Sequence, residues 1–181
     1  MSWIATHDSL TGLVNRKEFE ARLEQAIVQF NGQAVCAMFF DLDKFKAVND
    51  TGVHAAGDTV LSRRCGAAAL FEATVRQSDT VARLGGDEFA VLLPGCPLER
   101  AQELAEKIRL AVAGYSLPVA GQTFSVGTSI GLVEVTPDTP TVNAVLQAAD
   151  SACYAAKRAG RNCVVIYGVD SEDTAAAVVA P

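Results

Sequence analysis

The sequence lacks the features that would place the chain in a membrane or secreted class. Its longest apolar run, Ala34 to Phe40, is far shorter than the roughly 20 apolar residues of a membrane helix. The N-terminus has no basic segment followed by a long apolar stretch, so no signal peptide is expected. We therefore expect no membrane insertion by this segment and a cytoplasmic location.

Cysteine and histidine residues at the spacing of zinc ligands are also absent from the sequence. The five cysteines stand at positions 36, 65, 96, 153 and 163, and none forms a C-x-x-C pair. This odd, scattered set favours buried free thiols in a reducing compartment. His7 and His54 have no partners at ligand spacing, so no zinc site is expected.

Positive charge is in deficit, because the formal net charge at pH 7 is −6. Such a balance repels polyphosphate backbones in general and disfavours a nucleic-acid partner. A single anionic nucleotide can still bind if local cations and a metal ion assist. The length of 181 residues suits one domain, and a hydrophobic content of 50% allows a substantial core.

Hydrophobic periodicity and turn residues predict an alternation of strands and helices. The expected helices cover residues 15–30, 56–71, 97–112 and 142–159, and the expected strands cover residues 34–40, 80–84, 89–93, 115–119, 122–126, 129–135 and 164–167. Without its flanks the order is strand, helix, strand, strand, helix, strand. This order predicts an α+β fold with a ferredoxin-like or polymerase-palm βαββαβ core, in which helices flank an antiparallel central sheet. Residues 1–7 are expected to be a linker, 8–168 the domain, and 169–181 a disordered tail.

Two carboxylates follow the most apolar of these strands. Strand alternation turns Asp41 and Asp43 to one face and Leu42 to the other. A carboxylate there, with a nearby main-chain carbonyl, suits Mg²⁺, which prefers oxygen ligands. The alternative is a polar strand exit in which Asp43 caps the following turn.

A second acidic pair follows a glycine pair at residues 85–86. The glycines predict a tight hairpin tip that a ligand can approach closely. Asp87 and Glu88 come next, although desolvating adjacent carboxylates beside a buried strand is costly. If this hairpin lies beside the strand at 34–40, Asp87 faces Asp41 across a metal. Together they would form the two-carboxylate, divalent-metal site used in phosphoryl transfer.

The segment Gly85-Gly86-Asp87-Glu88-Phe89 resembles the signature of the GGDEF diguanylate cyclases. Further segments match that family in order and spacing over about Asp8 to Tyr167, namely Asp8 to Arg16, Phe40 to Lys46, Asn49-Asp50, Gly57-Asp58, Ser129 to Gly131, Ala149-Asp150, Tyr154, Lys157 and Gly160 to Asn162. The resemblance implies a nucleotide-cyclase-like fold. It also implies that two molecules of GTP are condensed into cyclic di-GMP and two pyrophosphates, with Mg²⁺ as cofactor or Mn²⁺ in its place.

The resemblance assigns roles to the acidic residues. Asp41 and Asp87 resemble side-chain metal ligands, with the Leu42 carbonyl as a further ligand. Glu88 stands where the family places a metal-linked or proton-accepting carboxylate, and all three acids are expected to be catalytic.

Other roles carried by the resemblance concern the substrate. Asn49 and Asp58 resemble the pair that reads guanine, because an amide and a carboxylate match its edge. The alternative for Asp58 is an ordinary helix N-cap. Gly86 is expected to lie against the substrate.

Three cations resemble the phosphate-binding residues of the family. They are Lys46, Lys157 and Arg161. For the last two, the alternative is a complement to the dipole at a helix C-terminus, which needs no ligand.

The resemblance also implies regulation and assembly. Arg76-Gln77-Ser78-Asp79 matches the R-x-x-D product-inhibition motif, and Lys107 stands near a position where relatives often have arginine. The alternative for Arg76 and Asp79 is a surface ion pair of little energetic value. Since one domain holds one GTP, a head-to-tail homodimer is expected to be needed for catalysis.

One departure keeps a second function open. Val53 stands where the family usually has glycine, beside the expected guanine pocket. The alternative function is therefore a weak or inactive module that binds GTP or cyclic di-GMP and regulates an attached domain. The flanking sequence suggests a longer parent chain with sensor and EAL-type domains. A polymerase-like palm acting on nucleic acid is disfavoured by the acidic balance.

Overall fold

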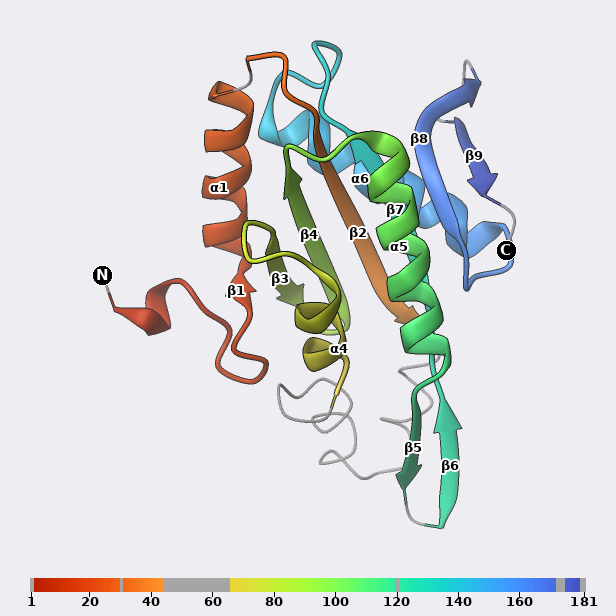
Figure 1. Ribbon diagram of the computed structural model, residues 1–181. Coiled ribbons are helices and arrows are strands. Elements are labelled where there is room, and N and C mark those ends of the chain that lie inside the picture. Colours follow the sequence, from red (N-terminus) through yellow and green to blue (C-terminus); the bar gives the residue numbers. More distant parts are fainter. Residues whose placement is uncertain (1, 30, 44–65, 120, 172–174, 180–181) are drawn as a thin grey trace.

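The computed structural model describes residues 2–29, 31–43, 66–119, 121–171 and 175–179. A twisted sheet with helices on both faces forms the body of the molecule (Figure 1). Within these ranges, no helix combines the length and the apolar character needed to cross a membrane.

The main sheet has seven strands in the order β1-β3-β4-β2-β7-β8-β9. Their bounds are β1 Val14–Asn15, β2 Val35–Asp43, β3 Thr80–Gly85, β4 Glu88–Pro94, β7 Gly127–Glu134, β8 Val164–Ser171 and β9 Ala175–Val179. The four central strands β3, β4, β2 and β7 are antiparallel, while β1 and β8 join them in parallel. The expected α+β fold with an antiparallel ferredoxin-like core is confirmed.

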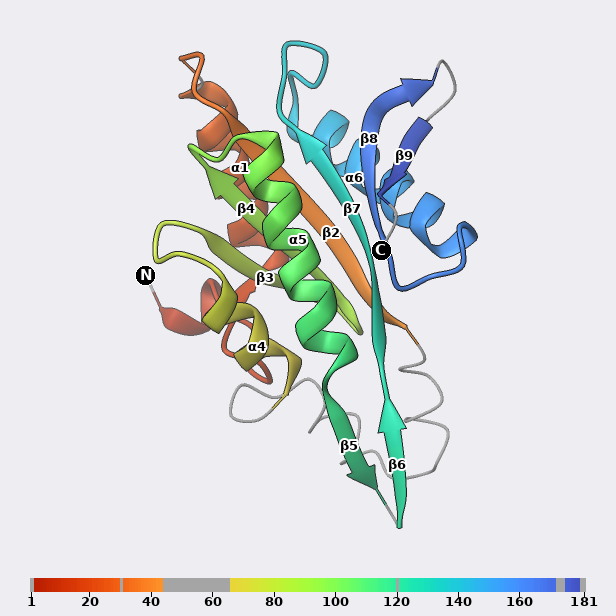
Figure 2. The same ribbon diagram turned by 45° about the vertical axis from the view of Figure 1, so that its right-hand side comes forward.

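Strand β2 is the centre of the core because both of its faces are covered. On one face Met38 and Phe40 lie in the cluster formed with α4 (Ala67–Thr74) and α5 (Leu98–Ala113). On the other face Phe39 lies in the cluster formed with α1 (Arg16–Val28) and α6 (Val142–Arg158). Figure 2 shows these two helical layers on either side of the sheet. Burial on both faces explains why this strand has a continuous apolar run rather than an alternating pattern.

The helix ends follow ordinary capping rules. The side chain of Asn15 accepts a hydrogen bond of 2.9 Å from the Glu18 amide and so starts α1. Thr141 caps the start of α6, because its hydroxyl accepts a hydrogen bond from the Ala144 amide. Beyond the other end of this helix, Gly160 has a positive φ of 115°. A separate hairpin of β5 (Ser116–Val119) and β6 (Gln122–Ser125) projects beyond the end of the sheet where β2 finishes (Figures 1 and 2).

The acidic hairpin differs in detail from the expectation. Strand β3 continues to Gly85, which is opposite Glu88, so the two loop residues are Gly86 and Asp87. Both glycines have positive φ, 150° and 52°, as a tight tip requires. A register shift between Arg83 and Gly85 accompanies the turn. Asp87 is therefore at the tip, which the sequence assigned to Gly85 and Gly86.

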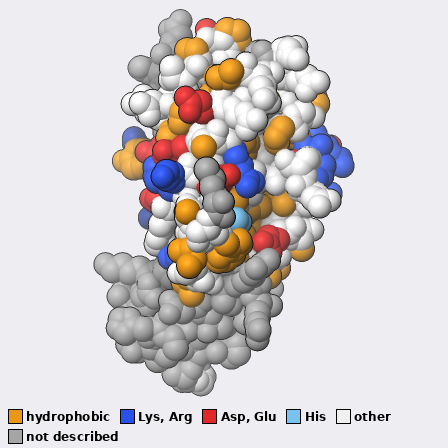
Figure 3. Space-filling view, turned by 90° about the vertical axis from the view of Figure 1, so that its left-hand side faces the viewer, with side chains coloured by type: hydrophobic (Ala, Val, Ile, Leu, Met, Phe, Trp, Pro, Cys, Tyr) orange, Lys and Arg blue, Asp and Glu red, His pale blue; other side chains and the backbone are white. Residues whose placement is uncertain are grey.

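Both chain ends pack more closely than the sequence indicated. The expectation of a disordered tail over 169–181 is wrong for residues 169–171, which belong to β8, and for Ala175–Val179, which pairs antiparallel with β8. Near the other end, Trp3–Ala5 forms a 3-10 helix (η1), and the Thr6 carbonyl accepts from the Asn15 amide. Figure 3 views the edge where this segment lies, and acidic and basic side chains are both interspersed there with hydrophobic ones. Of the helix expected over 56–71, only the end lies in the described residues, as the first part of α4.

Candidate active site

The carboxyl end of β2 meets the acidic hairpin. Asp41 is directly opposite Glu88 in the β2–β4 register. The Leu42 amide donates a hydrogen bond of 3.3 Å to the Asp87 carbonyl. The pairing of these two strands thus brings together the carboxylates that the sequence placed in separate segments.

The negative charge of Asp41 affects the pKa values of Asp87 and Glu88. Burial raises the pKa of Asp87, and the charge of Asp41 raises it further, although Lys157 acts in the opposite direction. Burial also raises the pKa of Glu88, with Asp41 again adding to the effect and Arg16 opposing it. Like charges held together in this way attract a cation.

Lys157 supplies one such cation. Its ammonium forms an ion pair with the Asp41 carboxylate, reaching across from α6. Burial opposes the charged form, but the hydrogen bond and charge of Asp41 prevail and raise the pKa of Lys157. The residue expected at the GTP phosphates therefore contacts an expected metal ligand. Arg161 is exposed just beyond the end of the same helix.

The donor chemistry of this end of the sheet fits Mg²⁺. Asp41 and Asp87 offer carboxylate oxygens, and a divalent cation would relieve the repulsion that raises the pKa of Asp87. Among the described residues, no three acidic, histidine or cysteine side chains already converge at metal spacing. An ion at Asp41 would compete with Lys157 for the same carboxylate.

Arg83 links the hairpin tip to Asp8, a residue distant in sequence. Two guanidinium nitrogens of Arg83 donate to the Gly86 carbonyl at 3.0 and 2.9 Å. The same guanidinium contacts the Asp8 carboxylate at 3.1 Å. Thr11 donates two hydrogen bonds to Asp8, and these together with Arg83 outweigh burial and lower the pKa of that carboxyl. The tip bearing Gly86 is thereby tied to the loop that precedes β1.

A cavity of about 370 Å³ lies on the α1 and α6 side of the carboxylates. Arg16, Asp41, Glu88 and Asp150 contribute to its wall. No role was assigned to Arg16 or Asp150 from the sequence, although both lie in segments that carry the family resemblance. Only the packing of α1 and α6 against the sheet brings them to the carboxylates.

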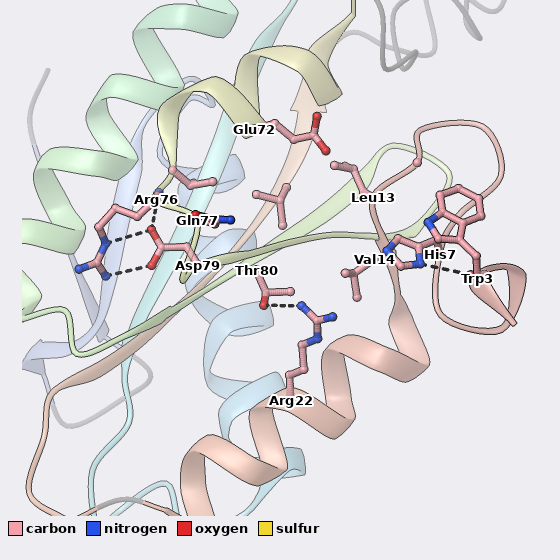
Figure 4. Close-up of a pocket in the computed structure, with 13 residues that line it drawn as sticks. Trp3, His7, Leu13, Val14, Arg22, Glu72, Arg76, Gln77, Asp79 and Thr80 are labelled. Atoms are coloured by element: carbon pink, nitrogen blue, oxygen red, sulfur yellow. Dashed lines mark hydrogen bonds and ion pairs between the residues drawn. The ribbon is translucent and has the colours of Figure 1, made fainter. Parts of the chain in front are cut away.

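The R-x-x-D residues form a second cluster. Arg76 holds the Asp79 carboxylate through Nη2 at 2.9 Å and Nε at 3.3 Å, as Figure 4 shows. The Arg76 amide adds a hydrogen bond of 2.8 Å to the same carboxylate. The Asp79 side chain is fully buried, while that of Arg76 is 56% exposed. Arg76 Nη2 also donates to the Pro94 carbonyl at 3.1 Å, so the guanidinium is held in place while much of the side chain stays exposed.

Lys107 lies at the same cluster. It shares with Arg76 and Asp79 a cavity of about 230 Å³ between α4 and α5. Cys96 and Arg100 also line this cavity, and sequence reasoning assigned neither to it. Arg100 stands seven residues before Lys107, two helical turns along α5, which is a signal that helical spacing could have given.

The structure thus brings together most of the predicted residues in two groups. Asp41, Leu42, Gly86, Asp87, Glu88 and Lys157 form the first, and Arg76, Asp79 and Lys107 form the second. The predictions for Lys46, Asn49, Val53 and Asp58 lie outside the described residues. A ferredoxin-like sheet with a carboxylate cluster at one end defines the class as nucleotide-cyclase-like α+β domains.

Comparison with known families narrows this class. Residues 5–163 match the family described as "Diguanylate cyclase, GGDEF domain". The chain therefore belongs to the GGDEF family, as its motifs indicated.

Individual relatives agree with this assignment. The chain is 42% identical over 169 residues to "Probable diguanylate cyclase DgcE" of Escherichia coli. The matched region covers 92% of this chain but 15% of that protein. It is also 42% identical over 165 residues to "Diguanylate cyclase TpbB" of Pseudomonas aeruginosa, covering 87% of this chain and 36% of that protein. The chain thus spans a minor part of these curated relatives.

A solved structure is similar over nearly its whole length. The GGDEF domain of DgcB from Caulobacter crescentus, in complex with c-di-GMP, superimposes with a TM-score of 0.83 at 34% identity. The match covers 90% of this chain and 95% of that one.

Proposed function

We propose that this chain is a diguanylate cyclase domain that binds GTP with Mg²⁺ and forms cyclic di-GMP. The observation that carries the proposal is the meeting of Asp41, Asp87 and Glu88 at one end of the sheet, with Lys157 beside them. Membership of the GGDEF family supports the same reaction. Two molecules of GTP are consumed and two pyrophosphates leave.

The chemistry follows from the charges at this site. The 3′-hydroxyl of one GTP attacks the α-phosphate of another, and pyrophosphate departs. Mg²⁺, or Mn²⁺ in its place, would be held by Asp41, Asp87 and the Leu42 carbonyl and would neutralise charge on the phosphates. Glu88, whose pKa is raised by burial and by Asp41, is suited to accept the hydroxyl proton. Lys157 and Arg161 would bind the β- and γ-phosphates, with Lys157 exchanging its contact with Asp41 for phosphate oxygens.

Catalysis requires two domains. One carboxylate cluster serves one GTP, and each new bond joins nucleotides held by different domains. The active species is therefore a head-to-tail homodimer, and activity per molecule rises with protein concentration.

The Arg76 cluster is the proposed site of product inhibition. An exposed arginine can donate hydrogen bonds to guanine or phosphate, here through Nη1, or through Nη2 in exchange for its contact with the Pro94 carbonyl. Lys107, in the same cavity, adds a positive charge. The complex of the DgcB domain with c-di-GMP supports binding of this ligand by the family.

Purified protein incubated with GTP and Mg²⁺ tests the cyclase. Nucleotides are separated by chromatography, and we expect cyclic di-GMP from the wild type but none from Asp87→Ala. Arg76→Ala should remain active and lose inhibition by added cyclic di-GMP. GTP binding without product, even in a fusion that forces dimerisation, would contradict the cyclase and support a regulatory binding module.

A further inference from the structure

Asp43 differs from Asp41 although both carboxylates lie on the same face of β2. The Ser129 hydroxyl donates a hydrogen bond to Asp43 Oδ1 at 2.8 Å, and the main-chain amide of Asn162 donates to Asp43 Oδ2 at 3.0 Å. The residue is only 6% exposed. Both carboxylate oxygens of Asp43 thus accept hydrogen bonds from neighbouring strands and turns, whereas the Asp41 carboxylate forms an ion pair with Lys157.

The backbone that Asp43 holds has an unusual conformation. Arg161 and Asn162 have φ values of 65° and 46°, so two successive L-residues lie in the left-handed region. The Arg161 amide is held by the Ala156 carbonyl at 3.1 Å, which closes the end of α6. The Asn162 amide lies beyond that closure and is held by Asp43. Arg161 is therefore bracketed by two anchored peptide groups.

Gly127 and Arg109 pack against the contact between Asp43 and Asn162. A Cβ at Gly127 would lie 3.3 Å from Asp43 Oδ2 and 3.4 Å from the Asn162 Cβ, closer than most such contacts. From the other side, Arg109 donates to the Asn162 Oδ1 at 3.3 Å. The turn is thus held through its main chain by Asp43 and through its side chain by Arg109.

We propose that Asp43 is a positioning residue for GTP binding, which acts by holding the Arg161–Asn162 turn so that Arg161 faces the phosphates. The inference rests on the proposed function, because it assumes that Arg161 binds the phosphates of GTP. It links the end of β2, where the metal ligands are, to the phosphate-binding residue beyond α6. Asp43 itself contacts neither metal nor nucleotide.

Asp43→Asn is the informative substitution. The side-chain amide keeps one oxygen to accept from the Asn162 main-chain amide, and its NH₂ group can donate to the Ser129 hydroxyl, so the substitution keeps the shape but removes the negative charge that strengthens both contacts. Calorimetry with 3′-deoxy-GTP and Mg²⁺ measures affinity without turnover, since this analogue has no attacking hydroxyl. We expect roughly tenfold weaker binding in Asp43→Asn, because the charge-assisted contact that holds the Asn162 main-chain amide becomes a neutral one. The amount of Mg²⁺ needed for half-saturation should stay unchanged.

A double-mutant cycle separates positioning from general destabilisation. If Asp43 acts through Arg161, the double variant Asp43→Asn with Arg161→Ala binds the analogue no more weakly than Arg161→Ala alone. Ser129→Ala removes one contact to Asp43 and should give a smaller loss of affinity, also absent in the Arg161→Ala background. This milder variant also serves if Asp43→Asn does not fold.

Thr139→Ala is the matched control. Thr139 is a buried polar residue beyond the opposite end of β7, hydrogen-bonded to Thr136, and its loss should lower the melting temperature without changing affinity. Additive losses in the cycle, unchanged affinity in both Asp43→Asn and Ser129→Ala, or a raised Mg²⁺ requirement in Asp43→Asn would overturn the positioning role. Failure of the wild type to bind the analogue would instead refute the proposed function.

Discussion

Replacing Asp87 by asparagine should stabilise the metal-free protein. Burial and the charge of Asp41 raise the pKa of Asp87 above its ordinary value of 3.8. A carboxyl with a raised pKa in the folded state opposes folding when it is ionised, and this cost develops as the pH rises from the unfolded pKa to the folded one. The gain from Asp87→Asn should therefore be complete at pH 7 and vanish below about pH 4.

The expected gain is small but measurable. Partly exposed like charges placed opposite one another cost roughly 0.5 kcal/mol. In a chain of this size that corresponds to a rise of about 1–2 °C in melting temperature. Thermal unfolding in the presence of a chelator, at pH 7 and at pH 3.5, measures it. Asp138→Asn, an exposed carboxylate beyond the far end of β7, is the control and should change neither value.

Magnesium should reverse the order of the melting temperatures, so that the wild type becomes more stable than Asp87→Asn. A ligand at ten times its dissociation constant stabilises the folded state by roughly 1.4 kcal/mol. This gain applies to the wild type, whereas Asp87→Asn has lost one of the two proposed carboxylate ligands. If Asp87→Asn melts below the wild type without metal, or gains as much from Mg²⁺, then the account of the carboxylate cluster is incorrect.

Two further predictions concern the scaffold of the site. Gly131→Ala should abolish folding or cost more than about 3 kcal/mol, because its Cβ would lie 2.3 Å from the Cys153 amide and 2.4 Å from the Ala149 carbonyl; a soluble variant with wild-type circular dichroism and melting temperature would contradict it. Asp8→Asn should cost roughly 1–2 kcal/mol in urea unfolding at pH 7, because it weakens the contact with Arg83 that ties down the hairpin tip. The pKa of Asp8 is lowered, so its contribution is present above the unfolded pKa and is lost as the pH falls through the lower folded value. A difference between Asp8→Asn and wild type that persists unchanged at pH 2 would argue against this origin.

Much of the local structure was readable from sequence. The Asn15 cap, the glycine pair at the hairpin and the end of α6 at Gly160 each depend on backbone chemistry within a few residues. The strand order along the chain predicted the antiparallel core. The tail was misread because the small residues 175–179 carry little strand signal, and their pairing depends on the exposed edge of β8.

The residue types alone show which chemical groups are available: the two acidic pairs, the cations and the R-x-x-D turn. Which partner each group contacts depends on the folding of the whole chain. Asp41 and Asp43 have the same residue type and share a strand face, yet one is directed to Lys157 and the other to the Asn162 amide. Asp41 and Asp43 differ because their partners come from segments distant in sequence, and only the sheet register and the packing of α6 bring these partners to β2.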